Sequence, residues 1–336
     1  MHNVTLIKGD GIGPSIMDAA VAVINASGAK INWHEADAGM SAYEKTGNPL
    51  PDATMQSIDE TRVAFKGPLT TMVGEGFRSI NVELRKKYDL YANVRPAKSW
   101  PGVKTRYDDV DIVVVRENTQ GLYVGLEHYL TPQKDIAESL AVVTKDSSER
   151  IVEYAFKYAI DNDRQKVTVC HKANILKFTQ GLFLNTAREV AKKYPQIEFD
   201  EKIIDAACMH MVMKPEQFDV VVTTNMFGDI LSDLTAGLVG GLGLIPGANI
   251  GRDAALFEAV HGSAPDIAGK NIANPTAVMM AGVMMLTHLG EHEAGMRMLH
   301  AIEKVVNEGK YVTPDLNPHS TCGTKEMGQA IVDAMA

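Results

Sequence analysis

Short apolar runs alternate with longer amphipathic stretches along this chain of 336 residues. Runs rich in β-branched residues, such as 111–117 (DIVVVRE) and 166–172 (KVTVCHK), predict buried strands. Stretches with a helical period, such as 14–26 and 147–160, predict helices between them. Strands that alternate with helices of this length are typical of an α/β fold.

The stretch 219–251 organises the rest of the chain. A β-branched run ends at Asn225, Gly228 opens a turn, and an apolar helix then carries Asp229 and Asp233. Side chains four residues apart in a helix share one face, so these carboxylates should lie close together. A helix dipole would explain Asp229 but not Asp233. We therefore expect a cation or a proton between them, and a hard divalent ion suits such ligands.

Charged residues follow several of the predicted strands. Open α/β sheets bind ligands at the carboxyl ends of their strands, so this placement predicts a site at that edge. The five residues are Arg116, Lys172, Asp205, Asp229 and Asp233.

A second group of polar residues lies between 79 and 95. Ser79 is placed to begin a helix on which Asn81 and Arg85 share one face, and Arg95 follows ten residues after Arg85. A guanidinium binds a carboxylate through two hydrogen bonds, so a pair of arginines aimed at one place suits a polycarboxylate.

Two nucleotide-binding motifs fail on inspection. After the first strand, Pro14 and Ile16 occupy the place of the third glycine in G-x-G-x-x-G, which argues against a Rossmann dinucleotide fold. The run from Gly262 to Lys270 has six residues between its glycines, where a P-loop needs four, and Asn271 stands where Ser or Thr should be.

The central stretch resembles the signature of the β-decarboxylating dehydrogenases, the isocitrate and isopropylmalate dehydrogenase family. The resemblance implies a two-domain, non-Rossmann α/β fold with the active site in the interdomain cleft. It also implies a large domain of residues 1–93 plus 246–336 and a small domain of 94–245, which carries a clasp-like arm. The matching residues are Asn225, Gly228, Asp229, Ser232, Asp233, Gly240, Gly241, Gly243, Pro246 and Asn249.

The same resemblance assigns roles to individual residues. Tyr123 resembles the general acid, and Lys172 the residue that helps remove the hydroxyl proton. Mg²⁺ or Mn²⁺ would be held by Asp205, Asp229 and Asp233. The substrate would be held by Ser79, Asn81, Arg85, Arg95 and Arg116. The cofactor would contact Ile12, Thr70, Asn174, His261, Gly262, Asp266, Ile267 and Asn274.

The resemblance also implies a homodimer, which can assemble further. Lys172 and Asp205 would enter the partner's active site, so one chain would lack a complete site. Two helices would pair with their copies, and their apolar surface would come from Met209, Met211, Met213, Ile230, Leu234 and Leu238.

By the same resemblance, Ser79 and Asn81 determine the substrate and Asp266 determines the cofactor. Polar Ser79 and Asn81 go with isocitrate, whereas isopropylmalate enzymes carry apolar residues there. Asp266 would accept from a ribose hydroxyl and repel a 2′-phosphate, so NAD is expected. NADP-linked relatives carry Lys and Tyr at 266 and 267, and supply a basic clamp where this chain has no Lys or Arg between Val312 and Thr321.

The predicted activity is the metal-dependent oxidative decarboxylation of isocitrate to 2-oxoglutarate with NAD, a step of the tricarboxylic acid cycle. One alternative is a dehydrogenase of homoisocitrate, 3-isopropylmalate or tartrate. Another is a non-catalytic, isocitrate-binding regulatory chain of a larger assembly, although such chains lose members of the catalytic set and this chain keeps them.

Composition and charge limit the classes of binding partner and the compartment that we expect. The formal net charge of −9 argues against nucleic acid and anionic membranes. The longest apolar run, 277–286, is too short to span a bilayer. Three cysteines without a C-x-x-C pair favour a reducing compartment. No leader precedes the first strand, so we expect a cytoplasmic protein.

Overall fold

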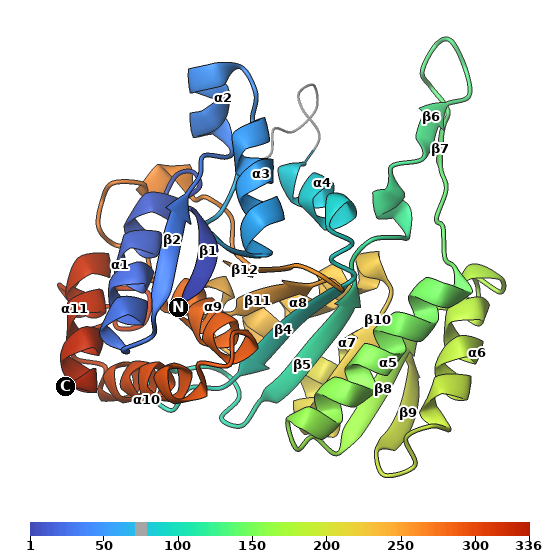
Figure 1. Ribbon diagram of the computed structural model, residues 1–336. Coiled ribbons are helices and arrows are strands. Elements are labelled where there is room, and N and C mark those ends of the chain that lie inside the picture. Colours follow the sequence, from blue (N-terminus) through green and yellow to red (C-terminus); the bar gives the residue numbers. More distant parts are fainter. Residues whose placement is uncertain (71–78) are drawn as a thin grey trace.

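The computed structural model describes residues 1–70 and 79–336 (Figure 1). Within these residues, ten strands form one mixed sheet in the order β2-β1-β3-β12-β11-β4-β5-β10-β8-β9, and β6 pairs with β7 in a hairpin. The strands are β1 His2–Ile7, β2 Ile31–Glu35, β3 Val63–Lys66, β4 Ala92–Lys98, β5 Asp111–Glu117, β6 Glu127–Tyr129, β7 Ala137–Ser139, β8 Lys166–His171, β9 Glu198–Ile203, β10 Val220–Thr223, β11 Pro246–Ile250 and β12 Ala255–Ala259.

Helices cover both faces of the sheet (Figure 1). They are α1 Gly13–Ala26, α2 Met40–Thr46, α3 Asp52–Thr61, α4 Ile80–Lys87, α5 Lys145–Asp161, α6 Thr179–Ala191, α7 Ile204–Met213, α8 Asn225–Leu238, α9 Thr276–His288, α10 His292–Glu308 and α11 Thr324–Met335.

Antiparallel strands interrupt the middle of an otherwise parallel sheet. β11 runs antiparallel to β12 and β4, and β4 runs antiparallel to β5. β5, β10, β8 and β9 are mutually parallel, as are β2, β1, β3 and β12. This order differs from the Rossmann order and agrees with the expected non-Rossmann α/β fold. The predicted domain boundaries fall on β4 and β11, and the division itself stays a prediction.

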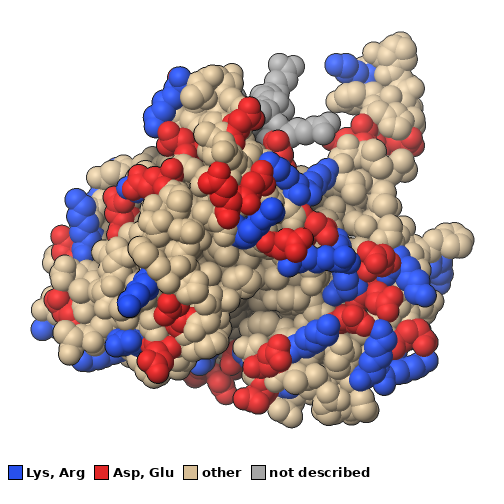
Figure 2. All heavy atoms as spheres, viewed as in Figure 1, with Lys and Arg blue, Asp and Glu red and all other residues tan. Residues whose placement is uncertain are grey.

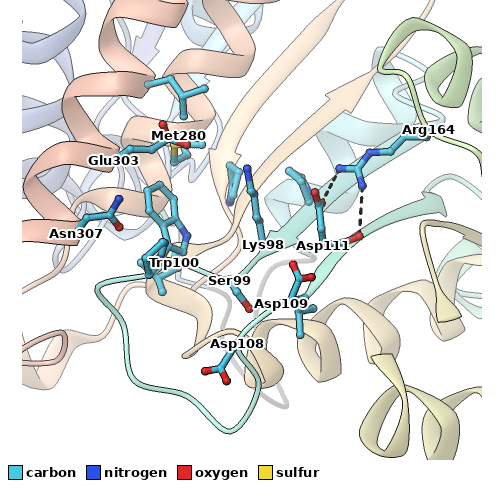
Figure 3. A pocket seen from close by; sticks show the side chains of 16 residues that line it. Lys98, Ser99, Trp100, Asp108, Asp109, Asp111, Arg164, Met280, Glu303 and Asn307 are labelled. Atoms are coloured by element: carbon cyan, nitrogen blue, oxygen red, sulfur yellow. Dashed lines mark hydrogen bonds and ion pairs between the residues drawn. The ribbon is translucent and has the colours of Figure 1, made fainter. Parts of the chain in front are cut away.

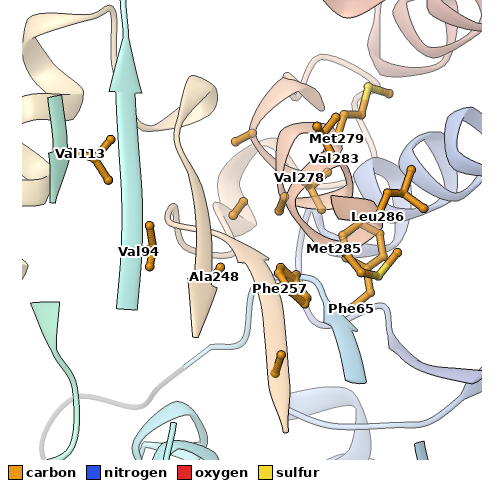
Figure 4. Packing of buried hydrophobic residues seen from close by; sticks show 14 of the residues in the cluster. Phe65, Val94, Val113, Ala248, Phe257, Val278, Met279, Val283, Met285 and Leu286 are labelled. Carbon is orange, nitrogen blue, oxygen red and sulfur yellow. The ribbon is translucent and has the colours of Figure 1, made fainter. Parts of the chain in front are cut away.

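Alternation along the central strands builds the two faces. Val113 and Val115 of β5 pack in the largest core cluster, whereas Ile112 and Val114 pack in a second cluster with α7 and α8. Figure 4 shows part of the largest cluster, where apolar side chains of α9 lie beside Phe257 and Phe65. The predicted buried helix at 277–286 is therefore confirmed as part of α9. The opposite face, which carries α4 and α8, is the one that holds the candidate site.

A hairpin extends away from the body between residues 127 and 139 (Figure 1). Its large apolar side chains are at least half exposed at Tyr129, Leu130 and Ile136. The hairpin lies within the range 94–245, for which the resemblance implies a clasp-like arm, and its role as a clasp stays a prediction.

The outer surface carries both signs of charge, interspersed on the face that Figure 2 shows. Ion pairs at the surface include Lys193 with Glu153, 2.6 Å apart. No helix in the described ranges has the length and apolar character that a bilayer crossing requires.

Candidate active site

Arg116 and Asp229 form the centre of the site. Arg116 is the last but one residue of β5, and Asp229 lies in the first turns of α8, which follows the neighbouring strand β10. Arg116 Nη1 donates to Asp229 Oδ1, while its Nε and Nη2 donate to Asn225 Oδ1 at 3.0 and 2.7 Å. A Cβ on Gly228 would lie 2.5 Å from Arg116 Cγ, so glycine is needed for α8 to pack against this arginine.

Tyr123 approaches the same carboxylate from the 3₁₀ turn Leu122–Val124. Its hydroxyl donates to Asp229 Oδ2 at 2.5 Å, and its ring lies 5.0 Å from the guanidinium carbon of Arg116. Burial and the hydrogen bond to Asp229 raise the pKa of Tyr123. The phenol therefore keeps its proton near neutral pH, as a general acid must.

Two further arginines converge on this centre. Arg95 Nη1 donates to Ser232 Oγ at 2.6 Å and lies 3.3 Å from Asp229 Oδ1 and 3.9 Å from Asp233 Oδ1. Burial and the nearby charge of Arg85 lower the pKa of Arg95. Like charges held this close in a buried place favour an anionic ligand.

A buried ion pair that the sequence did not point to lies on the far side of the cavity. Lys66 Nζ lies 2.7 Å from Glu258 Oε2, and Arg85 Nη2 lies 3.7 Å from Glu258 Oε1. Asn249 Nδ2 also donates to Glu258 Oε1, at 2.9 Å. Although burial raises it, Lys66 and Arg85 hold the pKa of Glu258 at about 2.

These side chains line one cavity of about 290 Å³, in which four basic side chains face two carboxylates. Four buried polar atoms of this lining, Asn81 Oδ1, Asn93 Oδ1, Arg95 Nε and His261 Nε2, have no hydrogen-bond partner among the described residues. Ser79 precedes α4 as predicted, but its side chain makes no capping bond. Excess positive charge with unused polar groups suits a polycarboxylate. The lining includes Lys66, Ser79, Asn81, Arg85, Asn93, Arg95, Arg116, Tyr123, Asp229, Glu258, His261 and Gly262.

Three of the predicted site residues, Lys172, Asn174 and Asp205, lie away from this cavity. Lys172 Nζ pairs with Asp205 Oδ1 at 2.7 Å, and neither lines the cavity. Asp205 belongs to the first turn of α7 rather than to the end of β9, and Asn174 is exposed. A contribution of these side chains to the site of a second chain stays a prediction.

Four of the predicted cofactor residues, Ile12, Thr70, His261 and Gly262, lie on three loops at the cavity. Ile12 N donates to the carbonyl of Ser263 at 2.9 Å, and Thr70 Oγ1 lies 2.8 Å from Ser263 Oγ. His261 Nδ1 lies 3.0 Å from the Gly262 carbonyl, which fixes the proton on Nδ1. Burial lowers the pKa of His261, so the buried and unpartnered Nε2 is a free acceptor.

The adenosine end of the predicted cofactor site carries an additional acid. Asn274 Nδ2 donates to Asp315 Oδ2 at 3.0 Å, and Asn274 Oδ1 accepts from the Thr276 amide. Asp266 is exposed in the turn Pro265–Ile267. The structure thus adds Asp315 to a region where the sequence pointed only to Asp266, Ile267 and Asn274.

The family model described as isocitrate/isopropylmalate dehydrogenase matches residues 3–331. The chain belongs to the isocitrate/isopropylmalate dehydrogenase family. Among solved structures of the family, isocitrate dehydrogenase from Methylococcus capsulatus is 62% identical, with a TM-score of 0.98 over 100% of this chain and 99% of that one.

Relatives within the family carry different names at similar identity. Mitochondrial isocitrate dehydrogenase (NAD) catalytic subunit 5 of Arabidopsis thaliana is 51% identical over 98% of this chain and 87% of its own length. Chloroplastic 3-isopropylmalate dehydrogenase of Solanum tuberosum is 48% identical over 95% and 88%. A mitochondrial regulatory subunit of isocitrate dehydrogenase (NAD) from Dictyostelium discoideum is 47% identical over 100% and 93%. Overall identity therefore leaves the substrate to be argued from the site.

The donor set on α8 fits the divalent metal that the family resemblance implies. Burial and the neighbouring charge of Asp229 raise the pKa of Asp233. By contrast, Arg116, Tyr123 and Arg95 together lower the pKa of Asp229 against the effect of burial. Two oxygen ligands one turn apart suit a hard cation, which would relieve their repulsion. In the described part of the chain, no three His, Cys, Asp or Glu side chains gather as a metal cluster.

A second and larger cavity, of about 500 Å³, lies at the other end of β4 and β5 (Figure 3). Lys98 and Asp111, which pair across the two strands, both line it. Trp100 and Met280 provide apolar walls, and Arg164 is engaged by Asp111 at 2.6 Å. None of the family's predicted site residues lines this cavity.

Proposed function

We propose that this chain is an NAD-dependent isocitrate dehydrogenase, which oxidises isocitrate and releases CO₂ to form 2-oxoglutarate with a divalent metal ion. The observation that carries the proposal is the convergence of Arg85, Arg95 and Arg116 on one cavity with Tyr123 and Asp229. Three guanidiniums match the three carboxylates of isocitrate.

Polar residues at the start of α4 favour isocitrate over 3-isopropylmalate. Ser79 and Asn81 both line the cavity. No described hydrogen bond involves the Ser79 hydroxyl or the side-chain amide of Asn81. A carboxylate gives these groups a partner, whereas an isopropyl group would leave them buried and unsatisfied. Asn81 presents its amide N–H₂ to a carboxylate after a half turn of the side chain.

The arginines hold the substrate's carboxylates throughout the reaction. Asp229 and Asp233, with Asp205 of the partner subunit, would hold Mg²⁺ or Mn²⁺, and the ion would supply Lewis-acid polarisation of the substrate oxygen at C2. Asp229 is already ionised and fixed by Arg116 and Arg95, so its oxygens need little reorganisation.

Proton transfer falls to two side chains. Lys172 of the partner subunit would help to remove the proton of the 2-hydroxyl, and NAD would supply the hydride acceptor for C2. Tyr123, protonated and held by Asp229, donates its proton to C3 after CO₂ has left.

We also propose NAD as the cofactor and a homodimer as the smallest complete enzyme. Support comes from Asp266 and Asp315, because carboxylates in this region would repel the 2′-phosphate of NADP. Exposed apolar residues on α7 and α8, Met209, Met213 and Ile230, supply surface for a second copy. Met211 and Leu238, predicted for that surface, are instead buried in the chain's own core. Several relatives are named as subunits, so a mixed assembly is the alternative.

The compartment is a further proposal. Three free cysteines suit a reducing compartment such as the cytoplasm. Localisation of the tagged full-length protein in its own cells tests this.

The test of the activity is a panel of 2-hydroxy acids, assayed with NAD and NADP in the presence of Mg²⁺ or a chelator. We expect NADH and 2-oxoglutarate from isocitrate with NAD, and loss of both with chelator. Stronger turnover of 3-isopropylmalate, homoisocitrate or tartrate would replace the substrate assignment. Isocitrate binding without turnover of any acid would favour a purely regulatory role instead.

A further inference from the structure

Asp10 is a buried carboxylate that no resemblance assigns. It lies in the glycine-rich loop between β1 and α1, and its side chain is among the buried ones at 7% exposure. No described cation lies within ion-pair distance of it, and the neighbouring Lys8 pairs with Asp18 and Glu35 instead. A buried charge without a counter-ion must be stabilised by hydrogen bonds.

Three backbone amides supply those bonds, and they come from two separate segments. Asp10 Oδ2 accepts from the amides of Met40 at 3.0 Å and Thr70 at 2.9 Å, and Oδ1 accepts from the amide of Ser41 at 3.2 Å. Met40 and Ser41 are the first two residues of α2, whose preceding residue is Gly39. A carboxylate from a distant loop therefore caps this short helix.

The contact is close on every side. A Cβ on Gly39 would lie 2.2 Å from Asp10 Oδ2, and Gly39 adopts a φ of 91°. On the loop that carries Asp10, a Cβ on Gly9 would lie 2.3 Å from the Pro68 carbonyl oxygen, and one on Gly11 would lie 2.0 Å from the Ser263 carbonyl oxygen. Asp10 thus occupies the junction of loops that pack without spare room.

Four of the predicted cofactor residues, Ile12, Thr70, His261 and Gly262, belong to the loops that meet here. Thr70 is held through its amide by Asp10 and through its hydroxyl by Ser263, whose carbonyl accepts from Ile12. His261 and Gly262 directly precede Ser263. Loss of the Asp10 carboxylate would release Thr70 and, with it, the relative placement of these loops.

We propose that Asp10 is a positioning residue for the cofactor, one that fixes the loops of Ile12, Thr70 and His261 in their cofactor-binding arrangement. The inference rests on the proposed function for the identity of the cofactor. It does not place Asp10 in contact with NAD. Its effect should therefore appear in cofactor affinity, with isocitrate binding retained.

The test compares Asp10→Ala and Asp10→Asn with a control that loosens the same helix from its other end. Gly47→Ala is that control, because Gly47 ends α2 at a φ of 75° with open space around it. NADH binding, followed by the fluorescence of its nicotinamide, is measured directly, beside thermal stability and the KM values for NAD and isocitrate.

Asp10→Ala should weaken NADH binding about tenfold or more, because three charge-assisted hydrogen bonds are lost. Asp10→Asn keeps one acceptor oxygen, enough for the Met40 and Thr70 amides, and should recover most of that affinity. Gly47→Ala should lower stability with NADH affinity unchanged. An Asp10→Ala protein that loses stability as Gly47→Ala does, with NADH affinity within twofold of the parent, would overturn the inference. Failure of the parent protein to oxidise isocitrate would contradict the proposed function alone, since NADH binding is read independently of turnover.

Discussion

Two cavities lie at opposite ends of the β4–β5 strand pair, and the smaller one is the better candidate for catalysis. Each has an arginine beside an aspartate: Arg116 with Asp229 at one end, and Arg164 with Asp111 at the other. The two aspartate side chains are almost equally exposed, at 39% and 40%. The arginines differ, because Arg116 is 1% exposed and Arg164 is 21% exposed.

The surroundings of the two pairs explain the difference in chemistry. Arg116 lies near Arg95 and Arg85, so burial and like charges lower its pKa and demand an anion. Arg164 pairs with two carboxylates, Asp111 and Asp219, and against the effect of burial these raise its pKa. The charge of Arg164 is therefore balanced within the fold, whereas the arginines around Asp229 leave positive charge that a ligand can neutralise. Unbalanced buried charge marks the site more reliably than cavity volume does.

The sharpest way to break this comparison is to neutralise the matched aspartates. Asp229→Asn removes the negative charge that faces two buried arginines, and it also changes a predicted metal ligand. The value of kcat should therefore fall roughly 1000-fold. Asp111→Asn should leave kcat within about twofold and cost only a modest loss of stability. Steady-state NADH formation and thermal unfolding check both variants. Equal losses of activity would remove the distinction between the two ends.

Replacing the proton-transfer groups should have the next largest effect. Tyr123→Phe removes the acid while keeping the ring on Arg116, so kcat should fall about 100-fold or more. Lys172→Met should behave similarly. Isocitrate should still bind to both proteins, as calorimetric titration would show. Normal turnover in both variants would refute the assigned roles.

Shortening one substrate arginine sharpens the contrast further. Arg95→Lys keeps the charge but loses the planar fork, so the KM for isocitrate should rise by about 10- to 100-fold, with a smaller change in kcat. Lys98→Ala, which removes a cation from the other cavity, is the matched control and should change neither constant. A KM that rises with Lys98→Ala would bring the second cavity into substrate binding.

Cofactor choice should respond to two neighbouring substitutions. Asp266→Lys with Ile267→Tyr replaces a carboxylate by groups that accept a 2′-phosphate, so the ratio of kcat/KM for NADP over NAD should rise at least about tenfold. Asp315 remains in this variant and should limit the gain. Persistent NAD preference would place the choice elsewhere in the chain.

The smallest effect on activity is expected at the apolar wall of the second cavity. Trp100→Ala should lower the free energy of unfolding by roughly 1 to 3 kcal/mol, because apolar contacts are lost. Turnover of isocitrate should stay within about twofold. Denaturant unfolding and NADH formation, measured on the same preparation, separate the two effects.

Regular apolar periodicity made much of the fold predictable. The stretch 111–117 was predicted as a strand and is β5, and the helix predicted at 147–160 is α5, which is longer by two residues at one end and one at the other. The strands β4, β11 and β12 and the short helix α2 were not predicted. Pro96, Gly247 and Asn249 interrupt the strand pattern in β4 and β11, whose pairing depends on distant partners.

Residues of the candidate site could be predicted where they lie close together in the sequence or belong to the family pattern. Arg116, Tyr123 and Asp229 were predicted and do meet. Lys66 and Glu258 were missed, since each ends or follows an apolar run and only the pairing of β3 with β12 brings them together. Residues 71–78 lie outside the described residues.

The most direct test of the central claim is a crystal structure with isocitrate and Mg²⁺. We predict isocitrate in the smaller cavity, with its carboxylates on Arg85, Arg95 and Arg116, and the metal on Asp229 and Asp233 with Asp205 of the partner subunit. Isocitrate bound beside Trp100, or an Asp229 side chain turned away from the ligand, would contradict the account.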